Sequence, residues 1–469
     1  MQQYSCRIIT IVYCGVLCAL IGCSTNPRIT TAAPEVQHNA NTKVLVDEGR
    51  RTASQAEYQE LLKASTTETA TRVMLDRLLE VTRGITGGDF LYTGNEARLL
   101  IDGPGTFKAM FEDIANAEDS IHLETYILMD DEVGRTLATH LIESRQRGVD
   151  VRVLIDAYGS VDLPEAFITR LRNNGIELRK FHPLDPTEDL RIWRSNNRDH
   201  RKILVIDGKI AYSGGINFSG VYSKGSFSAS GNTSAANTAW RDTHVRIVGP
   251  AVERFQQLFL KMWNMNMPEN EPLQGPRYFP ELEAQGDMLA GVIASSGGDD
   301  EEYDIYSVLA AAIGHAQKRI WITQAYFAPD EAFLEIIKTA AGRGVDVRLL
   351  LPGVTDAPLV LQASRSSYQE LLAAGVRIYE RSGSMLHAKT VVVDGVWSTI
   401  GSANFDYRSF VYNYELNAVL VSSDFGQAMQ KLFLVDLQHA DEIPLQEWQR
   451  RSLLQRLKEA VGTFIRPWL

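Results

Sequence analysis

Apolar positions along this chain follow two periods that alternate through most of its length. Residues 52–79 carry apolar side chains at helical spacing, and from Gly94 onward short β-branched runs alternate with amphipathic stretches. The runs at 203–206 and 391–393 are apolar on both faces, which is typical of strands buried inside a sheet. This alternation predicts an α/β fold in which mixed sheets are flanked by helices.

An internal repeat indicates that the α/β unit is built twice. The sequence RGVDVRVL at 147–154 returns as RGVDVRLL at 343–350, and each copy follows an amphipathic helix and opens a strand. A glycine stands at the end of each helix, where a left-handed cap is expected. We therefore predict two similar lobes, at 86–275 and 276–440, with the active site at their interface.

The first 23 residues have the layout of a secretory signal peptide. Arg7 precedes an apolar run at 8–21 that is short for a transmembrane span. The sequence LIGC, which ends at Cys23, resembles the bacterial lipobox, in which the cysteine is lipidated. A short uncleaved anchor is the alternative, and both place the protein on a membrane. The lipobox implies an envelope lipoprotein that faces the periplasm, and Ser24, in place of an aspartate, favours the outer membrane.

Two segments flank the predicted lobes. Residues 24–85 combine a tether rich in Thr, Ala, Asn and Pro with the first helical pattern. Residues 441–469 predict a basic amphipathic helix. Its apolar face suits either an anionic membrane surface or packing against the body of the protein, and the sequence does not decide between them.

Charge and cysteine content narrow the class of protein. The formal net charge is −11, which argues against nucleic acid as a partner because such binding depends on many Lys and Arg side chains. All four cysteines lie within the first 23 residues, so the body has no disulfide framework. With 45% apolar and 22% charged residues, the body is expected to be globular.

The strongest chemical signal is a polar motif that occurs once in each lobe. In each copy His and Lys stand two residues apart, Asp follows five residues after Lys, and Asn follows ten residues after Asp. At this spacing on a strand His and Lys point to the same face, whereas the motif Asp points away from Lys and is expected to position the site indirectly. The two catalytic motifs comprise His200, Lys202, Asp207 and Asn217, and His387, Lys389, Asp394 and Asn404.

These residue types can transfer a phosphodiester without a metal or another cofactor. A neutral histidine can attack phosphorus and form a phosphohistidine, while a protonated histidine donates to the leaving alkoxide. Lys202, Lys389, Asn217 and Asn404 are expected to hold the phosphoryl oxygens. No cluster with metal-ligand spacing is visible in the sequence. Because the two motifs are near-equivalent, the residues alone do not decide which histidine attacks.

The duplicated H-x-K-x4-D-x6-G-[GS]-x-N pattern resembles the phospholipase D superfamily, over most of the chain from Gly94 to Asp436. Gly94-Asn95, the sequence LETY at 123–126 and Tyr222 make it most similar to the bacterial type of cardiolipin synthase.

The resemblance also implies roles for individual residues. It assigns the attack to His200 and the acid role to His387. Members of the superfamily place an acidic residue downstream of each motif to orient its histidine. On this basis Asp242 is expected to serve His200, and Glu415 is expected to serve His387, although both could be exposed acids at strand ends.

Three functions are compatible with these observations. The first is a phosphatidyltransferase that converts two phosphatidylglycerol molecules to cardiolipin and glycerol. The second is a phospholipase D-type hydrolase of phospholipid or, less favoured, of nucleic acid, in which water replaces the acceptor. The third is a catalytically silent envelope scaffold, which the two complete motifs argue against. A lipid anchor and a possible interfacial helix favour membrane phospholipids over nucleic acid as the substrate, and the acidic net charge agrees. In the first function, membrane phospholipids are both donor and acceptor.

Overall fold

The computed structural model describes residues 44–469, apart from 48, 50, 89, 184–196, 227–238, 266–271, 274 and 298–302. The predicted signal peptide, the tether to residue 43 and the lipidation site Cys23 therefore lie outside the described residues. Within the described ranges, no helix is both long enough and apolar enough to span a bilayer.

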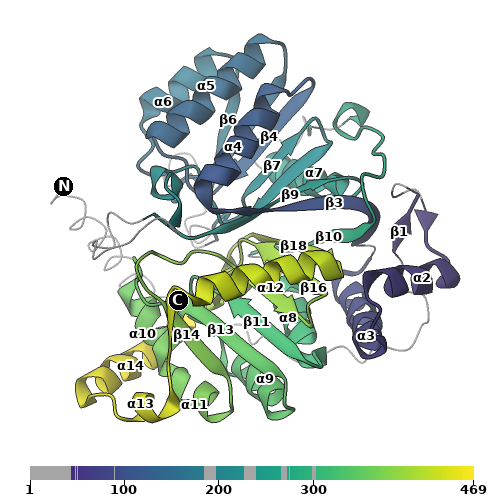
Figure 1. Cartoon of the computed structure of the whole chain (residues 1–469). Helices are drawn as coiled ribbons and strands as arrows, with labels where there is room; N and C mark the ends of the chain where they lie inside the picture. The colour runs from purple at the N-terminus through teal and green to yellow at the C-terminus, as the bar shows by residue number, and fades with distance from the viewer. Residues whose placement is uncertain are drawn as a thin grey trace.

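The first half of the molecule is a mixed seven-stranded sheet, drawn in blue and teal in Figure 1. Its strand order is β6-β5-β4-β7-β8-β9-β3, in which β4, β5 and β6 run parallel and the other pairs are antiparallel. The strands are β3 (Leu91–Ile101), β4 (Ser120–Thr125), β5 (Asp150–Asp156), β6 (Glu177–Phe181), β7 (Ile203–Ile206), β8 (Ile210–Gly214) and β9 (Thr243–Val248). The helices are α4 (Asp102–Ala115), α5 (Glu132–Gln146), α6 (Glu165–Asn173) and α7 (Val252–Met265).

The second half repeats this order as β14-β13-β11-β15-β16-β18-β10. Strands β3 and β10 pair antiparallel and join the halves into one sheet, which confirms the predicted α/β fold of two similar units. The strands are β10 (Met288–Ser295), β11 (Arg319–Thr323), β13 (Asp346–Pro352), β14 (Arg377–Arg381), β15 (Thr390–Val393), β16 (Trp397–Gly401) and β18 (Glu415–Val421). The helices are α8 (Asp304–His315), α9 (Glu331–Gly342), α10 (Pro358–Ser366), α11 (Tyr368–Ala373) and α12 (Ser423–Leu437).

Strand β7 shows why the motif strands consist almost entirely of apolar residues. Leu204 and Ile206 belong to the core beneath α4, α5 and α6, whereas Ile203 and Val205 face the core that contains α7. A strand covered on both faces has no position for a solvated side chain. The predicted helix ends are also present, since Gly148 and Gly344 have φ of 100° and 89° after α5 and α9.

Short elements complete the chain. Strands β1 (Leu45–Val46) and β2 (Arg51–Thr52) precede α2 (Gln55–Ser65) and α3 (Thr69–Thr86), which pack on the second half. Strand β12 (Phe327–Ala328) pairs with β17 (Phe405–Asp406), and η2 (Gly220–Tyr222), η5 (Pro276–Tyr278) and the π-helix η6 (Arg408–Tyr412) lie in connections.

The C-terminal segment is divided, where a single helix over 441–469 was expected. It forms β19 (Ala440–Glu442), α13 (Leu445–Gln449), α14 (Leu453–Ile465) and η7 (Arg466–Trp468). Strand β19 extends the sheet beside β14. A new helix begins after α13 because the Ser452 hydroxyl accepts a hydrogen bond from the Gln455 amide and caps it.

Candidate active site

Each motif histidine lies at the junction of the two halves, in the segment that leads into β7 or β15. The backbone amide of His200 donates to the Tyr414 carbonyl at 3.0 Å, and the amide of His387 donates to the Arg241 carbonyl at 2.7 Å. Each motif therefore begins on backbone of the opposite half. His200 is 8% exposed and His387 is 5% exposed, so both imidazoles are largely withdrawn from water.

The carboxylates that contact the histidines come from opposite halves. His200 Nδ1 lies 2.9 Å from Glu415 Oε1, and His387 Nδ1 lies 2.7 Å from Asp242 Oδ2. The expected pairing of Asp242 with His200 and of Glu415 with His387 is therefore wrong. The cause is the backbone contact described above, because it sets each motif histidine beside the residue that directly precedes the acid of the other half.

Both carboxylates are suited to accept from their histidines. Burial opposes their ionisation, but the charge and the hydrogen bond of His200 outweigh it and hold the pKa of Glu415 at about 2. His387 and Lys389 likewise hold the pKa of Asp242 below its usual value against burial. An ionised carboxylate only accepts, so Nδ1 of each histidine carries the hydrogen. Nε2 of each ring is then left for chemistry.

Burial determines the charge of the histidines. It lowers the pKa of His200 to about 4, although Glu415 opposes this shift, and it lowers the pKa of His387, with Lys389 adding to the effect. Near pH 7 His200 is therefore neutral. A neutral imidazole with a fixed Nδ1 hydrogen has an available lone pair on Nε2, which is the state that a nucleophile requires.

The motif lysines share this buried site. Lys202 Nζ donates to the His200 carbonyl at 2.5 Å, and Lys389 Nζ donates to the His387 carbonyl. Burial lowers the pKa of Lys202 to about 7 and that of Lys389 to about 8, and the charge of Lys389 adds to the shift of Lys202. Two cations in one buried site disfavour each other, and an anionic ligand between them would relieve that cost.

The motif asparagines are buried in different surroundings. Asn217 Oδ1 accepts from the Ile127 amide at 3.2 Å, and its Nδ2 lies 3.4 Å from the Tyr222 hydroxyl. The side-chain oxygen of Asn404 is buried with no hydrogen-bond partner within the described part of the chain. The side-chain oxygen of Asn404 is therefore less committed than that of Asn217.

The motif aspartates lie at the far ends of β7 and β15. The Asp207 carboxylate accepts from the backbone amides of Glu118, Asp119 and Ser120, and Asp394 accepts from those of residues 317–319. Both have positive φ, 54° and 52°. The prediction that Asp207 and Asp394 belong to the catalytic groups does not fit these contacts, because each carboxylate holds the start of the neighbouring strand. They position β7 and β15 instead.

We predict that Asp207→Asn and Asp394→Asn act on stability and spare chemistry. Asparagine tolerates the left-handed backbone but keeps only one acceptor oxygen, so each variant should lose about 1–2 kcal/mol of unfolding free energy. Turnover per folded molecule should stay near that of the parent. Denaturant melts and active-fraction kinetics measure the two effects, and a large loss of turnover in a fully folded variant would contradict this assignment.

Several aromatic contacts of the histidines were not anticipated from the sequence. The Tyr126 ring lies edge-on to His200 with centroids 4.9 Å apart, and Tyr326 lies edge-on to His387 at 6.2 Å. The Tyr222 hydroxyl lies 3.1 Å from His387 Nδ1, and Trp240 packs on the same imidazole at 5.0 Å. The sequence signal for the contacts of Tyr126 and Tyr326 was the internal repeat, which aligns these two tyrosines.

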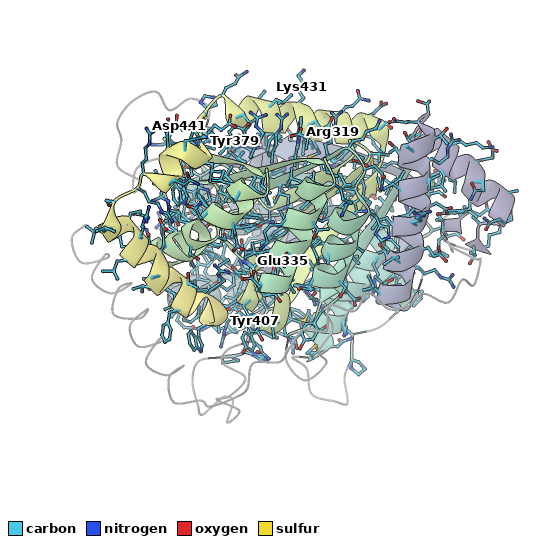
Figure 2. All side chains as sticks on the ribbon, turned by 90° about the horizontal axis from the view of Figure 1, so that it is seen from below. Arg319, Glu335, Tyr379, Tyr407, Lys431 and Asp441 are labelled. Atoms are coloured by element: carbon cyan, nitrogen blue, oxygen red, sulfur yellow. The ribbon has the colours of Figure 1, made fainter. Side chains whose placement is uncertain are left out.

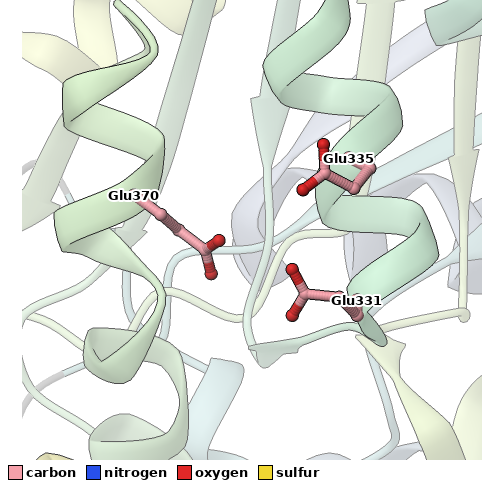
Figure 3. Close-up of side chains that lie close together, drawn as sticks. All are labelled: Glu331, Glu335 and Glu370. Atoms are coloured by element: carbon pink, nitrogen blue, oxygen red, sulfur yellow. The ribbon is translucent and has the colours of Figure 1, made fainter.

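A group of three glutamates deserves comparison with a metal site, because Glu331, Glu335 and Glu370 gather between α9 and α11 (Figure 3). Lys338 Nζ lies 2.5 Å from a Glu335 oxygen and 2.7 Å from a Glu370 oxygen. This ammonium group already supplies the positive charge that the carboxylates attract. The group contains no residue of either motif and is explained as an ion-pair network.

A family profile described as "Cardiolipin synthase, PLD-like domain" matches residues 110–263 and 309–437. These two segments contain both histidine motifs and both carboxylates. The crystal structure of phosphatidylserine synthase from Haemophilus influenzae Rd KW20 has a similar fold, with a TM-score of 0.61 at 14% identity, over 86% of this chain and 97% of that chain. The fold and the paired motifs thus define a phospholipase D-like protein.

Sequence relatives identify the family within this class. A cardiolipin synthase of Staphylococcus aureus (strain Mu50) is 38% identical over 381 residues, which are 81% of this chain and 75% of the relative. A cardiolipin synthase of Geobacillus sp. (strain WCH70) is 42% identical over 378 residues, 80% of this chain and 72% of the relative. The chain belongs to the cardiolipin synthase family of phospholipase D-like proteins.

Proposed function

We propose that this enzyme moves a phosphatidyl group from one phosphatidylglycerol to another, forming cardiolipin and glycerol through a phosphohistidine on His200. The observation that carries the proposal is the reciprocal pair of buried histidine–carboxylate contacts. It provides two imidazoles with fixed Nδ1 hydrogens in one site, where one can attack while the other transfers a proton. Family membership supports phospholipid as the substrate class.

The first step forms the covalent intermediate. The Nε2 lone pair of His200 attacks phosphorus, an N–P bond forms, and the bond from phosphorus to the headgroup glycerol oxygen breaks. Protonated His387 gives its Nε2 proton to that oxygen, so glycerol leaves as a neutral alcohol. Burial lowers the pKa of His387, and the negative charge of the bound phosphodiester would offset this by favouring the protonated ring.

The second step regenerates the enzyme. The neutral His387 accepts the proton of an acceptor hydroxyl on a second phosphatidylglycerol, whose oxygen attacks phosphorus as the N–P bond breaks. One phosphodiester is broken and one is formed, so no nucleotide is consumed. The charge on the phosphoryl oxygens is met by Lys202 and Lys389, and Asn217 and Asn404 are proposed to donate hydrogen bonds to the same oxygens.

Product identification tests this function. The full-length protein would be incubated with phosphatidylglycerol vesicles in the presence of a chelator, and the products identified by mass. We expect cardiolipin and glycerol in equal amounts and no requirement for a divalent ion. Phosphatidic acid as the main product would show that water is the acceptor, and loss of activity restored by a divalent ion would contradict the metal-free chemistry.

The activity should depend on pH through the lysines, His200 and the acid His387. Burial lowers the pKa of His387, so its protonated form is lost as pH rises and adds to the fall on the alkaline side. The pKa of Lys202 is about 7 and that of Lys389 about 8, so their charge is present below these values and is lost as pH rises through them. His200 must be neutral to attack, and its pKa is about 4, so activity should be lost as pH falls through about 4. We expect kcat/KM to be highest at about pH 5 to 7 and to fall at higher pH. Initial rates across the range test this, and a flat profile above pH 7 would contradict it.

We further propose that the protein is an envelope lipoprotein anchored through Cys23 and facing the periplasm. The arrangement of charged start, apolar run and cysteine supports this. Two or more acyl chains would give stable attachment, which one chain does not. Cys23→Ser should leave an unprocessed, unlipidated precursor that still begins at Met1, as measured by intact mass and metabolic labelling. Cleavage and fractionation like the parent would contradict the assignment.

A further inference from the structure

The C-terminal helix α14 and the turn η7 carry a row of large apolar side chains that face solvent. Leu453 is 81% exposed and Phe464 is 68% exposed, values far from those of a packed helix face. In Figure 2 these yellow helices lie along one edge of the second half. The exposed row, here called the outer face, consists of Leu453, Leu454, Leu457, Val461, Phe464 and Trp468.

The opposite, polar face of α14 packs against the protein. Glu459 is buried and pairs with Arg451 at 2.8 Å, and Gln455 Nε2 donates to Gln362 Oε1 at 3.1 Å. Gly462 approaches α10 so closely that an added Cβ would lie 2.4 Å from the Gln362 carbonyl carbon. These contacts fix the rotation of the helix. The apolar row therefore points outward because these contacts hold the helix in this rotation, and not because the helix is loosely attached.

The charged residues around the outer face indicate what kind of surface it binds. Arg450, Arg456 and Lys458 are exposed, while Glu459, the one acidic residue from 450 to 469, is buried and neutralised by Arg451. At about 100° per residue, Arg456 and Lys458 flank the outer face on opposite sides. An apolar row bordered by cations, on a protein whose net charge is −11, complements acyl chains beneath anionic phosphates.

The segment that carries the outer face contacts segments that lead to the active site. Leu359, also exposed, lies on α10, the helix that supports α14. That helix begins two residues after Asp356, whose carboxylate accepts from Tyr326, the ring beside His387. At the other end, the Leu469 carbonyl accepts from the Arg408 amide at 2.9 Å, at the start of the π-helix that leads to Glu415. The helix that supports α14 and the end of η7 are thus each linked, through neighbouring residues, to one of the two histidine–carboxylate pairs.

We propose that the outer face is an interfacial anchor that inserts into the surface of an anionic phospholipid bilayer and seats the active site against it. That the active site meets a lipid substrate in this bilayer rests on the proposed function, whereas binding of the outer face to the bilayer does not. A lipidated N-terminus would keep the protein near a membrane, but attachment at one end of a chain does not by itself set the orientation of the folded body. The outer face supplies the orientation, because its rotation is fixed by the contacts of Gln455, Glu459 and Gly462.

Photocrosslinking tests the contact in the full-length protein. A photoreactive benzophenone amino acid would replace Leu457 or, as a matched control, Leu434, an exposed leucine on α12. With vesicles of phosphatidylglycerol we expect lipid adducts at position 457 in at least about tenfold excess over position 434. Vesicles of phosphatidylcholine should give fewer adducts. Equal labelling at both positions, or a crosslink to a second copy of the chain, would overturn the proposal.

Kinetics test whether turnover at a bilayer depends on the outer face. The variant L457Q/F464Q changes only exposed side chains, so its melting temperature should match that of the control V73Q/L434Q. We expect turnover on phosphatidylglycerol vesicles to fall about tenfold or more in the first variant only, with cleavage of a short-chain, monomeric phosphatidylglycerol unchanged in both. Equal turnover of both variants on vesicles would overturn the anchor. Loss on both substrates would contradict it as well, and inactivity of the parent would refute the proposed function instead.

Discussion

Replacing either motif histidine by alanine should reduce turnover by at least about 10³-fold, because neither imidazole can both attack phosphorus and protonate the leaving oxygen. His200→Ala removes the proposed nucleophile, and His387→Ala removes the proposed acid. His140→Ala, at a histidine on α5 outside the site, is the matched control. Appreciable turnover in either motif variant would refute a single site built from both halves.

Trapping assigns the roles. In His387→Asn, a donor with a labelled phosphoryl group should leave its label on His200, because attack is possible while release is slow. His200→Asn should give no label. Label on His387 in His200→Asn, with none in the first variant, would reverse the two roles while leaving the shared site intact. Peptide mass analysis under neutral conditions distinguishes these results, since the N–P bond is acid-labile.

The exchanged carboxylates should produce the second large effect. Glu415→Gln and Asp242→Asn each replace the ionised acceptor of a histidine Nδ1 hydrogen by a neutral amide, whose NH2 group can donate to Nδ1 and favour the other tautomer. Each should reduce turnover by about 10²- to 10⁴-fold. The contacts predict that Glu415→Gln impairs attack by His200, and that Asp242→Asn impairs protonation by His387.

A donor with a nitrophenyl leaving group separates these defects. Nitrophenolate leaves without a proton, so formation of the phosphoenzyme should recover in Asp242→Asn and remain slow in Glu415→Gln. Pairing within each half would give the reverse result. The matched control is Asp436→Asn, which removes a buried carboxylate that pairs with Arg241 and not with a histidine. Its effect should be on folding, measured by thermal melting.

The sequence was sufficient for the fold and the histidines because both follow from local periodicity. His and Lys two apart on a strand share a face, and a buried strand between helices must be apolar on both sides. Ile203 to Ile206 satisfy that rule residue by residue. The repeat supplied the second half, since the same elements and the same motif recur there in the same order.

The carboxylate pairing could not be obtained in the same way. Asp242 follows His200 in sequence, and Glu415 follows His387, so proximity along the chain favours the wrong partners. What decides the pairing is the contact of Tyr414 with His200 and of Arg241 with His387 across the halves, which are main-chain hydrogen bonds with no sequence signature. Gly462 presents the same difficulty, because a helical wheel does not reveal which face is packed.

The exchange of acids between halves also bears on how such an enzyme can arise. Each half lends a carboxylate and receives one, so the two contributions are related as by a twofold axis. A protein with one such half would have an oriented histidine only as a symmetric dimer, in which the same surface patch serves both partners. Joining two copies in one chain preserves that contact and frees each histidine to specialise, one as nucleophile and the other as acid.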